Sequence, residues 1–231
     1  MTTSICRDGN PPAKNVGTDR DKVSETLDGI VDLYEKNLAD YGLTSKSVGW
    51  KDEVSQRLRF DKLAHVISPQ DESFTVNDFG CGYGAMFQYF SALPGVSLEK
   101  YYGYDLSEEM LAAAKEAVPD PRAVFIKASR VTEEADYSFV SGTFNVKLEA
   151  SDEVWADYLK EVLLNLATHS RKGIAFNLLS TYVDWKQENL YYADPFMFFD
   201  FCKRNISRYV SLLHDYPLYE WTIVVRKGDP Q

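Results

Sequence analysis

The sequence of 231 residues lacks any apolar run long enough to cross a membrane, and its start, Met1–Asn10, is too polar for a signal peptide. It has only three cysteines, Cys6, Cys81 and Cys202, an odd number without the spacing of metal ligands. These absences exclude a disulfide framework and give no sign of a metal site. We therefore expect a protein of the reducing cytoplasm with no membrane partner.

Basic residues are also scarce, since 25 Lys and Arg stand against 35 Asp and Glu, for a formal net charge of −10. No stretch concentrates the positive charge that a phosphate backbone requires, which argues against a nucleic-acid partner. A chain that is 45% hydrophobic and 26% charged is typical of one globular domain. We expect residues 1–19 to be a disordered tail and residues 20–231 to form that domain.

The most informative stretch is Thr75–Ala85, TVNDFGCGYGA, which predicts a buried strand that runs into a glycine turn. Gly80, Gly82 and Gly84 alternate, and glycines so placed let the backbone bend sharply and approach a ligand closely. The residues that follow can start a helix whose N–H groups and positive dipole end face the same place. Dinucleotide sites share this pattern, so the glycines alone leave the ligand open.

Two aspartates narrow the choice. Asp78 comes two residues before the first glycine, where its carboxylate would repel a pyrophosphate and favour a ligand with an ammonium group. Asp105 lies near the end of the next predicted strand, Tyr101–Leu106, and an acid there can accept hydrogen bonds from ribose hydroxyls. Alternatively, Asp105 braces the turn after that strand and Asp78 pairs with a surface cation.

The motifs DFGCGYG and GYDLSEEML, with DYSFVSGTFNV beyond them, resemble the S-adenosylmethionine-dependent methyltransferases of the Rossmann-like class over roughly residues 50–227. This resemblance implies a doubly wound α/β fold with a mostly parallel seven-stranded sheet and a C-terminal antiparallel hairpin. Residues 20–67 would form an N-terminal helical cap, and residues 74–228 the Rossmann-like core. S-adenosylmethionine would be the cofactor and S-adenosylhomocysteine the product.

The resemblance also implies which residues hold the cofactor: the aspartates and glycines around its methionine half and ribose, and Leu106 against the adenine. The full set that we expect is Gln56, Arg59, Asp78, Gly80, Cys81, Gly82, Asp105, Leu106, Ser129 and Ser141. The side chain of Gln56 either hydrogen-bonds to nearby backbone or contacts the carboxylate of the cofactor. Arg59 is the other residue that could contact this carboxylate. Ser129 stands where relatives often place an acid that reads the adenine amino group, so the adenine contact is open.

Ligands of open α/β sheets bind at the carboxyl ends of the strands, beside the point where the strand order reverses. In the family this point lies between the first and fourth strands, which makes Asn145, after the predicted strand 137–141, a catalytic candidate; a brace for its loop is the alternative. His214 links two predicted strands and is a candidate base, because histidine changes charge near neutral pH, or else it is structural.

Aromatic residues with polar tips suit the wall of a substrate site, and simple packing is the alternative for each. The candidates are Trp50, Tyr182, Tyr191 and Tyr192. We predict methyl transfer to an oxygen or nitrogen of a small soluble molecule. The rival hypotheses are a nicotinamide-dependent oxidoreductase, a non-catalytic protein that binds an adenosyl ligand, and a methyltransferase of proteins; dimerisation is open.

Overall fold

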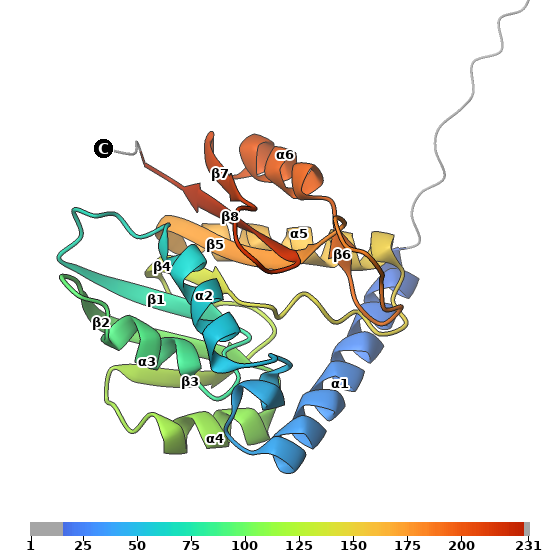
Figure 1. The fold of residues 1–231 in the computed structure, drawn as a ribbon, viewed down its shortest axis with the longest axis horizontal. Helices are drawn as coiled ribbons and strands as arrows, with labels where there is room; N and C mark the ends of the chain where they lie inside the picture. The colour runs from blue at the N-terminus through green and yellow to red at the C-terminus, as the bar shows by residue number, and fades with distance from the viewer. Residues whose placement is uncertain (1–15, 229–231) are drawn as a thin grey trace, which may run out of the picture.

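The structure is a computed structural model that describes residues 16–228 (Figure 1). The predicted tail over residues 1–15, with Cys6, lies outside the described residues, whereas residues 16–19 already belong to the first helix. The elements are α1 Val16–Tyr41, η1 Ser45–Val48, α2 Glu53–Ala64, β1 Ser73–Phe79, α3 Ala85–Ser91, β2 Ser97–Asp105, α4 Glu108–Ala117, β3 Ala123–Lys127, β4 Ala135–Val140, α5 Asp152–Thr168, β5 Ser170–Ser180, β6 Tyr192–Ala193, α6 Pro195–Asn205, β7 Tyr209–Leu213 and β8 Glu220–Arg226.

One mixed sheet organises these elements, in the order β3-β2-β1-β4-β5-β8-β7. The strands from β1 to β5 are parallel to their neighbours, and β8 is antiparallel to both β5 and β7. The predicted fold class is therefore confirmed. The sequence did not predict β6, a two-residue strand that pairs with the end of β5 inside the long connection after it.

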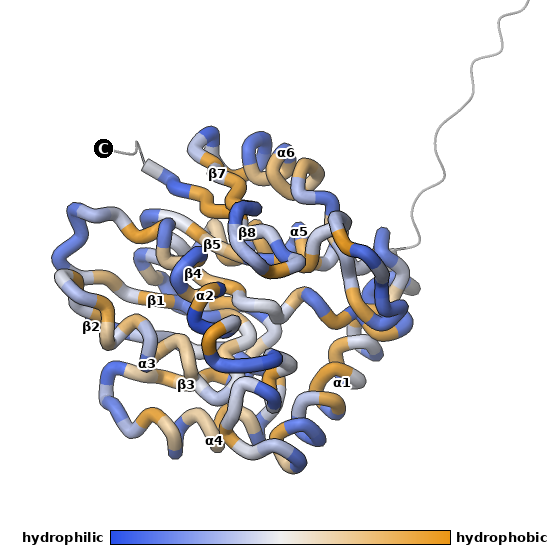
Figure 2. The backbone as a smooth tube through the Cα atoms, in the orientation of Figure 1, coloured by the Kyte–Doolittle hydropathy of each residue, from blue (hydrophilic) through white to orange (hydrophobic). Residues whose placement is uncertain are grey.

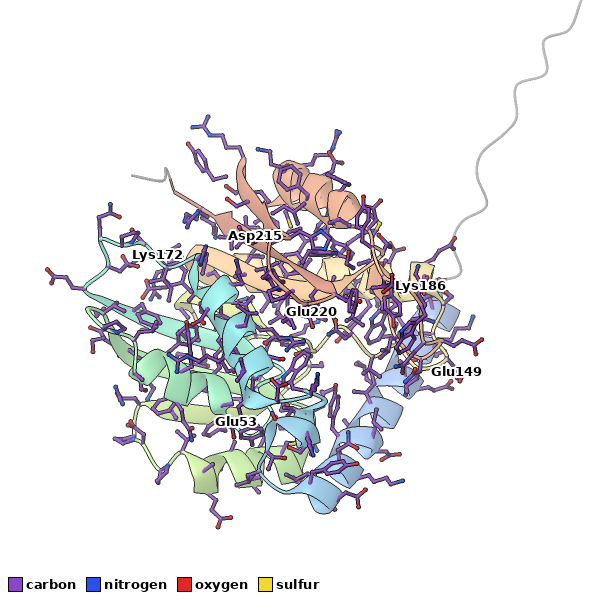
Figure 3. All side chains as sticks on the ribbon, viewed as in Figure 1. Glu53, Glu149, Lys172, Lys186, Asp215 and Glu220 are labelled. Atoms are coloured by element: carbon purple, nitrogen blue, oxygen red, sulfur yellow. The ribbon has the colours of Figure 1, made fainter. Side chains whose placement is uncertain are left out.

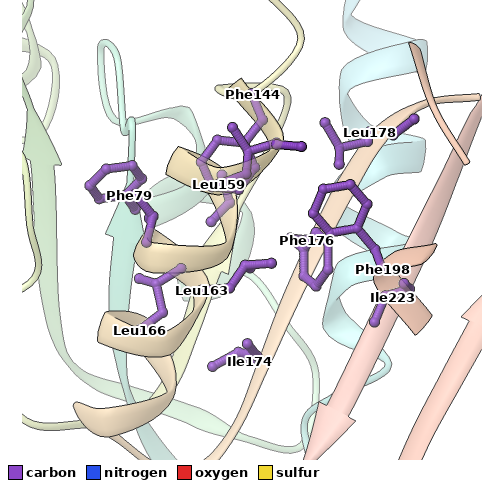
Figure 4. Packing of buried hydrophobic residues seen from close by; sticks show 14 of the residues in the cluster. Phe79, Phe144, Leu159, Leu163, Leu166, Ile174, Phe176, Leu178, Phe198 and Ile223 are labelled. Atoms are coloured by element: carbon purple, nitrogen blue, oxygen red, sulfur yellow. The ribbon is translucent and has the colours of Figure 1, made fainter. Parts of the chain in front are cut away.

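Helices cover both faces of the sheet (Figure 1). Residues of α2, α3 and α4 pack on one face, and residues of α1, α5 and α6 pack on the other. Figure 2 shows apolar residues along the central strands and polar residues on the outer loops. Figure 4 shows how Leu159, Leu163 and Leu166 of α5 lie against the sheet near Ile174 and Phe176. Burying one such side chain stabilises the fold by about 1.5–3 kcal/mol.

The segment before the sheet differs in detail from its prediction. Within the predicted helical cap over residues 20–67, helix α2 begins at Glu53 because Asp52 caps it, accepting a hydrogen bond from the Ser55 N–H at 2.7 Å. The stretch before it contains η1, which is followed by Gly49 with a φ of +81°. In this way η1 is held against α1 and can cover the carboxyl edge of the sheet.

The strand order reverses between β1 and β4, since the chain adds β2 and β3 on one side and β5 on the other. The carboxyl ends of β1, β2 and β4 meet there, which is where a ligand of this fold class binds. Within residues 16–228, no helix is long and apolar enough to cross a membrane.

Candidate active site

The turn after β1 requires glycine for two reasons. Gly80, Gly82 and Gly84 have φ angles of +76°, +53° and +81°, in the left-handed region that favours glycine. A Cβ on Gly80 would also collide with the side chain of Thr143, and one on Gly82 would lie 2.8 Å from Val48. The turn is thus pressed between the loop after β4 and η1.

Asp105 ends β2 beside this turn. Its carboxylate accepts hydrogen bonds from the N–H groups of Gly82 at 3.0 Å and Ser107 at 3.1 Å, one on each oxygen. Burial raises the pKa of Asp105, and these two hydrogen bonds oppose that rise. Each oxygen keeps a further lone pair, so the carboxylate can still accept hydrogen bonds from two neighbouring hydroxyls.

A first cavity, of about 90 Å³, opens beside Asp105. On the sheet side it is lined by Gly80, Gly82, Leu106 and Ser141. The N-terminal segment forms the facing wall with Leu27, Ile30, Val31, Tyr34 and Val48. This volume is well below the ~300–1,000 Å³ of ligand pockets.

A second cavity, of about 30 Å³, lies on the other side of the glycine turn. It is lined by Trp50, Gln56, Asp78, Cys81 and Tyr83, among others. Both cavities share Val48, Gly80 and Ser141, so they adjoin each other at the glycine turn. At this junction the Ser141 Oγ atom is buried and has no hydrogen-bond partner among the described residues.

Asp78 is the charged group of the second cavity, and it is 2% exposed. The Tyr101 hydroxyl donates a hydrogen bond to it at 2.5 Å. Burial raises the pKa of Asp78 to about 7, with a smaller contribution from the negative charge of Asp105, while the Tyr101 hydrogen bond opposes the rise. A cation that enters the cavity would therefore favour the ionised carboxylate.

All the residues predicted to hold the cofactor line one of these two cavities, except Arg59 and Ser129. Arg59 is instead engaged by Glu220, to which its Nε donates at 2.9 Å, and its guanidinium stacks on the ring of Trp50 at 3.8 Å. Ser129 lines a groove of about 1,280 Å³ between α1 and α5. This groove adjoins the first cavity, with which it shares Leu27, Val31, Leu106 and Tyr158.

The two catalytic candidates line neither cavity. Asn145 is buried, and its side-chain oxygen accepts the Leu179 N–H at 3.2 Å, which is the bracing arrangement. His214 is exposed in the link between β7 and β8, with its ring 5.7 Å from that of Tyr182. Since β7 is parallel to β5, this link does lie on the carboxyl edge of the sheet, and the base role stays a prediction.

Of the four aromatic residues predicted to form the substrate wall, one lines a cavity and three do not. Trp50 lines the second cavity. Tyr182 is 63% exposed, whereas Tyr191 is 3% exposed and packed against Phe198 in the core. The Tyr192 hydroxyl accepts a hydrogen bond from a backbone N–H of its own loop.

Three residues of this region escaped the sequence analysis: Tyr34, Asn177 and Glu220. Tyr34 lies among apolar residues at helical spacing, a pattern typical of core packing, yet it lines the first cavity. Burial raises its pKa to about 12. For Asn177 and Glu220 the available signal was a polar residue in an otherwise apolar strand.

The comparisons with known proteins agree with this geometry. Residues 76–173 match a family model described as a methyltransferase domain. Over 160 residues, or 68% of the chain, the sequence is 47% identical to the Mycobacterium tuberculosis (strain ATCC 25618 / H37Rv) protein Rv1506c, which carries the provisional name of a methyltransferase; the match spans 95% of that relative. The chain belongs to the methyltransferase family.

Solved structures show that this methyltransferase shares its fold with distant relatives. One is magnesium protoporphyrin IX methyltransferase (ChlM) from Synechocystis PCC 6803 with bound SAH, at 12% identity and a TM-score of 0.59 over 91% of this chain and 99% of that one. Another is the DhpI–SAH complex, at 12% identity and a TM-score of 0.63 over 90% of this chain and 98% of that one.

Proposed function

We propose that this methyltransferase moves the methyl group of S-adenosylmethionine to an oxygen or nitrogen atom of a small soluble molecule. The observation that carries the proposal is the pair of cavities joined at Gly80 and Ser141. One has a carboxylate suited to ribose, Asp105, and the other has a buried carboxylate suited to an ammonium group, Asp78. A nicotinamide dinucleotide carries no ammonium group for the second site.

In this arrangement the adenosyl half fills the first cavity, with its ribose hydroxyls on Asp105 and its base against Leu106. The amino-acid half fills the second cavity, with its ammonium group on Asp78. Tyr83 donates a hydrogen bond to the side-chain oxygen of Gln56 at 3.2 Å, which turns the Gln56 amide N–H groups toward a carboxylate. The sulfonium then lies at the junction of the cavities, beside Ser141.

The chemistry makes few demands on side chains. S-adenosylmethionine supplies an electrophilic methyl group, so the protein has to hold the acceptor in line with it and exclude water. The N-terminal wall from α1 and η1 excludes water from the first cavity, and Asn145 fixes the loop after β4 by accepting the Leu179 N–H. A hydroxyl acceptor additionally needs a base, for which His214 remains our candidate.

A transfer assay with S-adenosylmethionine labelled in its methyl group tests the proposal. We expect label to enter a low-molecular-weight fraction of a metabolite extract, and Asp105→Ala to abolish most of that transfer. Label that enters RNA or protein instead would overturn the small-molecule acceptor. Binding of S-adenosylhomocysteine without transfer to any fraction would support the non-catalytic alternative.

A further inference from the structure

Arg59 on α2 is a buried cation with one corner of its guanidinium unused. The residue is 7% exposed, and both Nε and Nη2 donate to the carboxylate of Glu220 on β8. The Nη1 atom is buried and has no hydrogen-bond partner among the described residues. The planar fork fixes the direction of Nη1, because the edge formed by Nε and Nη2 already faces Glu220.

Glu220 belongs to a closed circuit of contacts. One of its oxygens accepts the side-chain N–H of Asn177 at 2.6 Å, and the Asn177 oxygen accepts the N–H of Gly142 at 2.8 Å. The indole of Trp50 rests on Gly142, where a Cβ would collide with it, and Arg59 stacks on the same indole at 3.8 Å. Figure 3 places Glu220, the first residue of β8, near the middle of the molecule.

A purely structural ion pair between α2 and β8 accounts for only part of this arrangement. The ion pair explains the hydrogen bonds of Nε and Nη2, but it leaves Nη1 without an acceptor. A cationic N–H that is buried without an acceptor is costly, and such groups are rare in native structures. The circuit also meets both cavities, since Gly142 lines the first and Trp50 lines the second. Arg59 is thus linked to the lining of both cavities through Trp50 and Gly142.

The cofactor has other partners for its charged ends. Asp78 and Gln56 line the second cavity and suit the ammonium and carboxylate groups of the cofactor, whereas the guanidinium of Arg59 stacks on the Trp50 indole that lines the same cavity. The ligand that remains for Nη1 is the molecule that receives the methyl group. A carboxylate matches a guanidinium corner best, because its charge and planar oxygens give a short, charge-assisted hydrogen bond.

We propose that Arg59 recognises a carboxylate on the methyl acceptor, with Glu220 and Asn177 holding the guanidinium in place and Trp50 as the ring against which the acceptor lies. This inference rests on the proposed function, and it narrows the acceptor to small carboxylic acids. The role of Glu220 and Asn177 is positioning, since Glu220 holds the guanidinium of Arg59 and Asn177 donates to Glu220.

Nitrogen-15 NMR of the arginine side chains tests this assignment on the wild-type protein. The Nη signals of Arg59 are assigned with Arg59→Lys and followed during a titration with sodium acetate, with and without saturating S-adenosylhomocysteine. Sodium chloride is the ionic-strength control. Arg57, on the same helix and 5.8 Å from the Tyr89 ring, is the internal control, assigned with Arg57→Lys.

We expect acetate, but not chloride, to shift the Arg59 signals saturably in the protein loaded with S-adenosylhomocysteine, and to leave the Arg57 signals in place. The proposal would be overturned if S-adenosylhomocysteine alone shifted the Arg59 signals and acetate then had no effect. That result would mean that Nη1 binds the carboxylate of the cofactor. No response to either ligand would overturn it too. If S-adenosylhomocysteine fails to bind, the proposed function falls, while the acetate titration without it still decides the Arg59 site.

Discussion

In the proposed complex, Asp105 is the side chain on which cofactor recognition depends most. Asp105→Ala removes the acceptor of the ribose hydroxyls, and losing hydrogen bonds to a charged group costs about 1.5–3 kcal/mol, or about one to two orders of magnitude in Kd. We expect that loss for S-adenosylhomocysteine in a calorimetric titration.

The matched control is Asp120→Ala, which removes a partly exposed aspartate paired with Arg122 on the loop before β3. It should bind S-adenosylhomocysteine as the wild type does. Equal affinity of Asp105→Ala and the wild type would remove the ribose assignment.

Asp78 makes cofactor affinity depend on pH. With a pKa of about 7, its carboxyl is mostly neutral at pH 6 and half ionised at pH 7. An ammonium ligand needs the ionised form, so affinity for S-adenosylmethionine should rise about fivefold from pH 6 to pH 7. The rise should end near pH 7.7–8.0, where the α-amino group of the ligand loses its own proton, roughly at the value of a free α-amine.

Two variants check the origin of this pH dependence. Tyr101→Phe removes the hydrogen bond that lowers the pKa of Asp78, which moves the affinity curve to higher pH. Asp78→Asn should abolish the pH dependence of the affinity.

The raised pKa of Asp78 also affects the stability of the protein. Because the folded-state pKa is raised, the native state binds more protons than the unfolded state between about pH 4 and 7, and stability falls as pH rises through that window. Asp78→Asn should therefore have a higher melting temperature than the wild type at pH 8.

At this scale the predictable residues are those whose partners are close in the sequence. Asp78, Gly80 and Gly82 lie within five positions, so their joint role can be read from the motif. Arg59 meets a partner 161 positions away, and nothing in the helix around it indicates Glu220. The sequence therefore indicated a role for a cation on α2 but could not show that another side chain already holds it.

Among the connecting elements, the loop after β4 is pinned by the N-terminal segment at Gly142. This glycine has a φ of +72°, and a Cβ there would collide with Trp50. For an alanine, the left-handed backbone conformation alone costs about 1–2 kcal/mol. Gly142→Ala should lower the free energy of unfolding by several times that amount, because its Cβ also collides with Trp50. The variant should also shift the fluorescence of Trp50.

Gly95→Ala separates the two causes, since Gly95 has a φ of +79° and nothing within 4 Å of its Cβ position. Gly95→Ala should lower the free energy of unfolding by the backbone cost alone. Equal losses of stability for the two variants, measured by urea unfolding, would show that Trp50 does not press on the loop.

Helix α2 is fastened to β8 by a buried ion pair, with 8% and 2% side-chain exposure for Arg59 and Glu220. Glu220→Gln leaves the cation without its counter-charge, and breaking such a pair destabilises a protein by about 3–5 kcal/mol. We expect that loss in urea unfolding. Asp215→Asn breaks the exposed pair with Lys62, which joins the same two parts of the chain, and should change stability little. A Glu220→Gln variant as stable as Asp215→Asn would contradict the importance of burial.

For the molecule as a whole, the parallel sheet and its terminal hairpin could be predicted because the motifs that carry the family resemblance are local in the sequence. The site could be predicted only where it is built from strand ends. The part of its wall that comes from α1 could not be predicted, because an apolar stripe that lines a ligand cavity has the same spacing as one that packs on a core. Tyr34 is the residue for which this ambiguity mattered.

The central claim is that the glycine turn and its two aspartates enclose an adenosyl sulfonium, and calorimetric titration of the whole chain with S-adenosylmethionine and with NAD tests it most directly. We predict saturable binding of S-adenosylmethionine at one site per chain and no heat from NAD. Saturable binding of NAD, with none of S-adenosylmethionine, would contradict the claim.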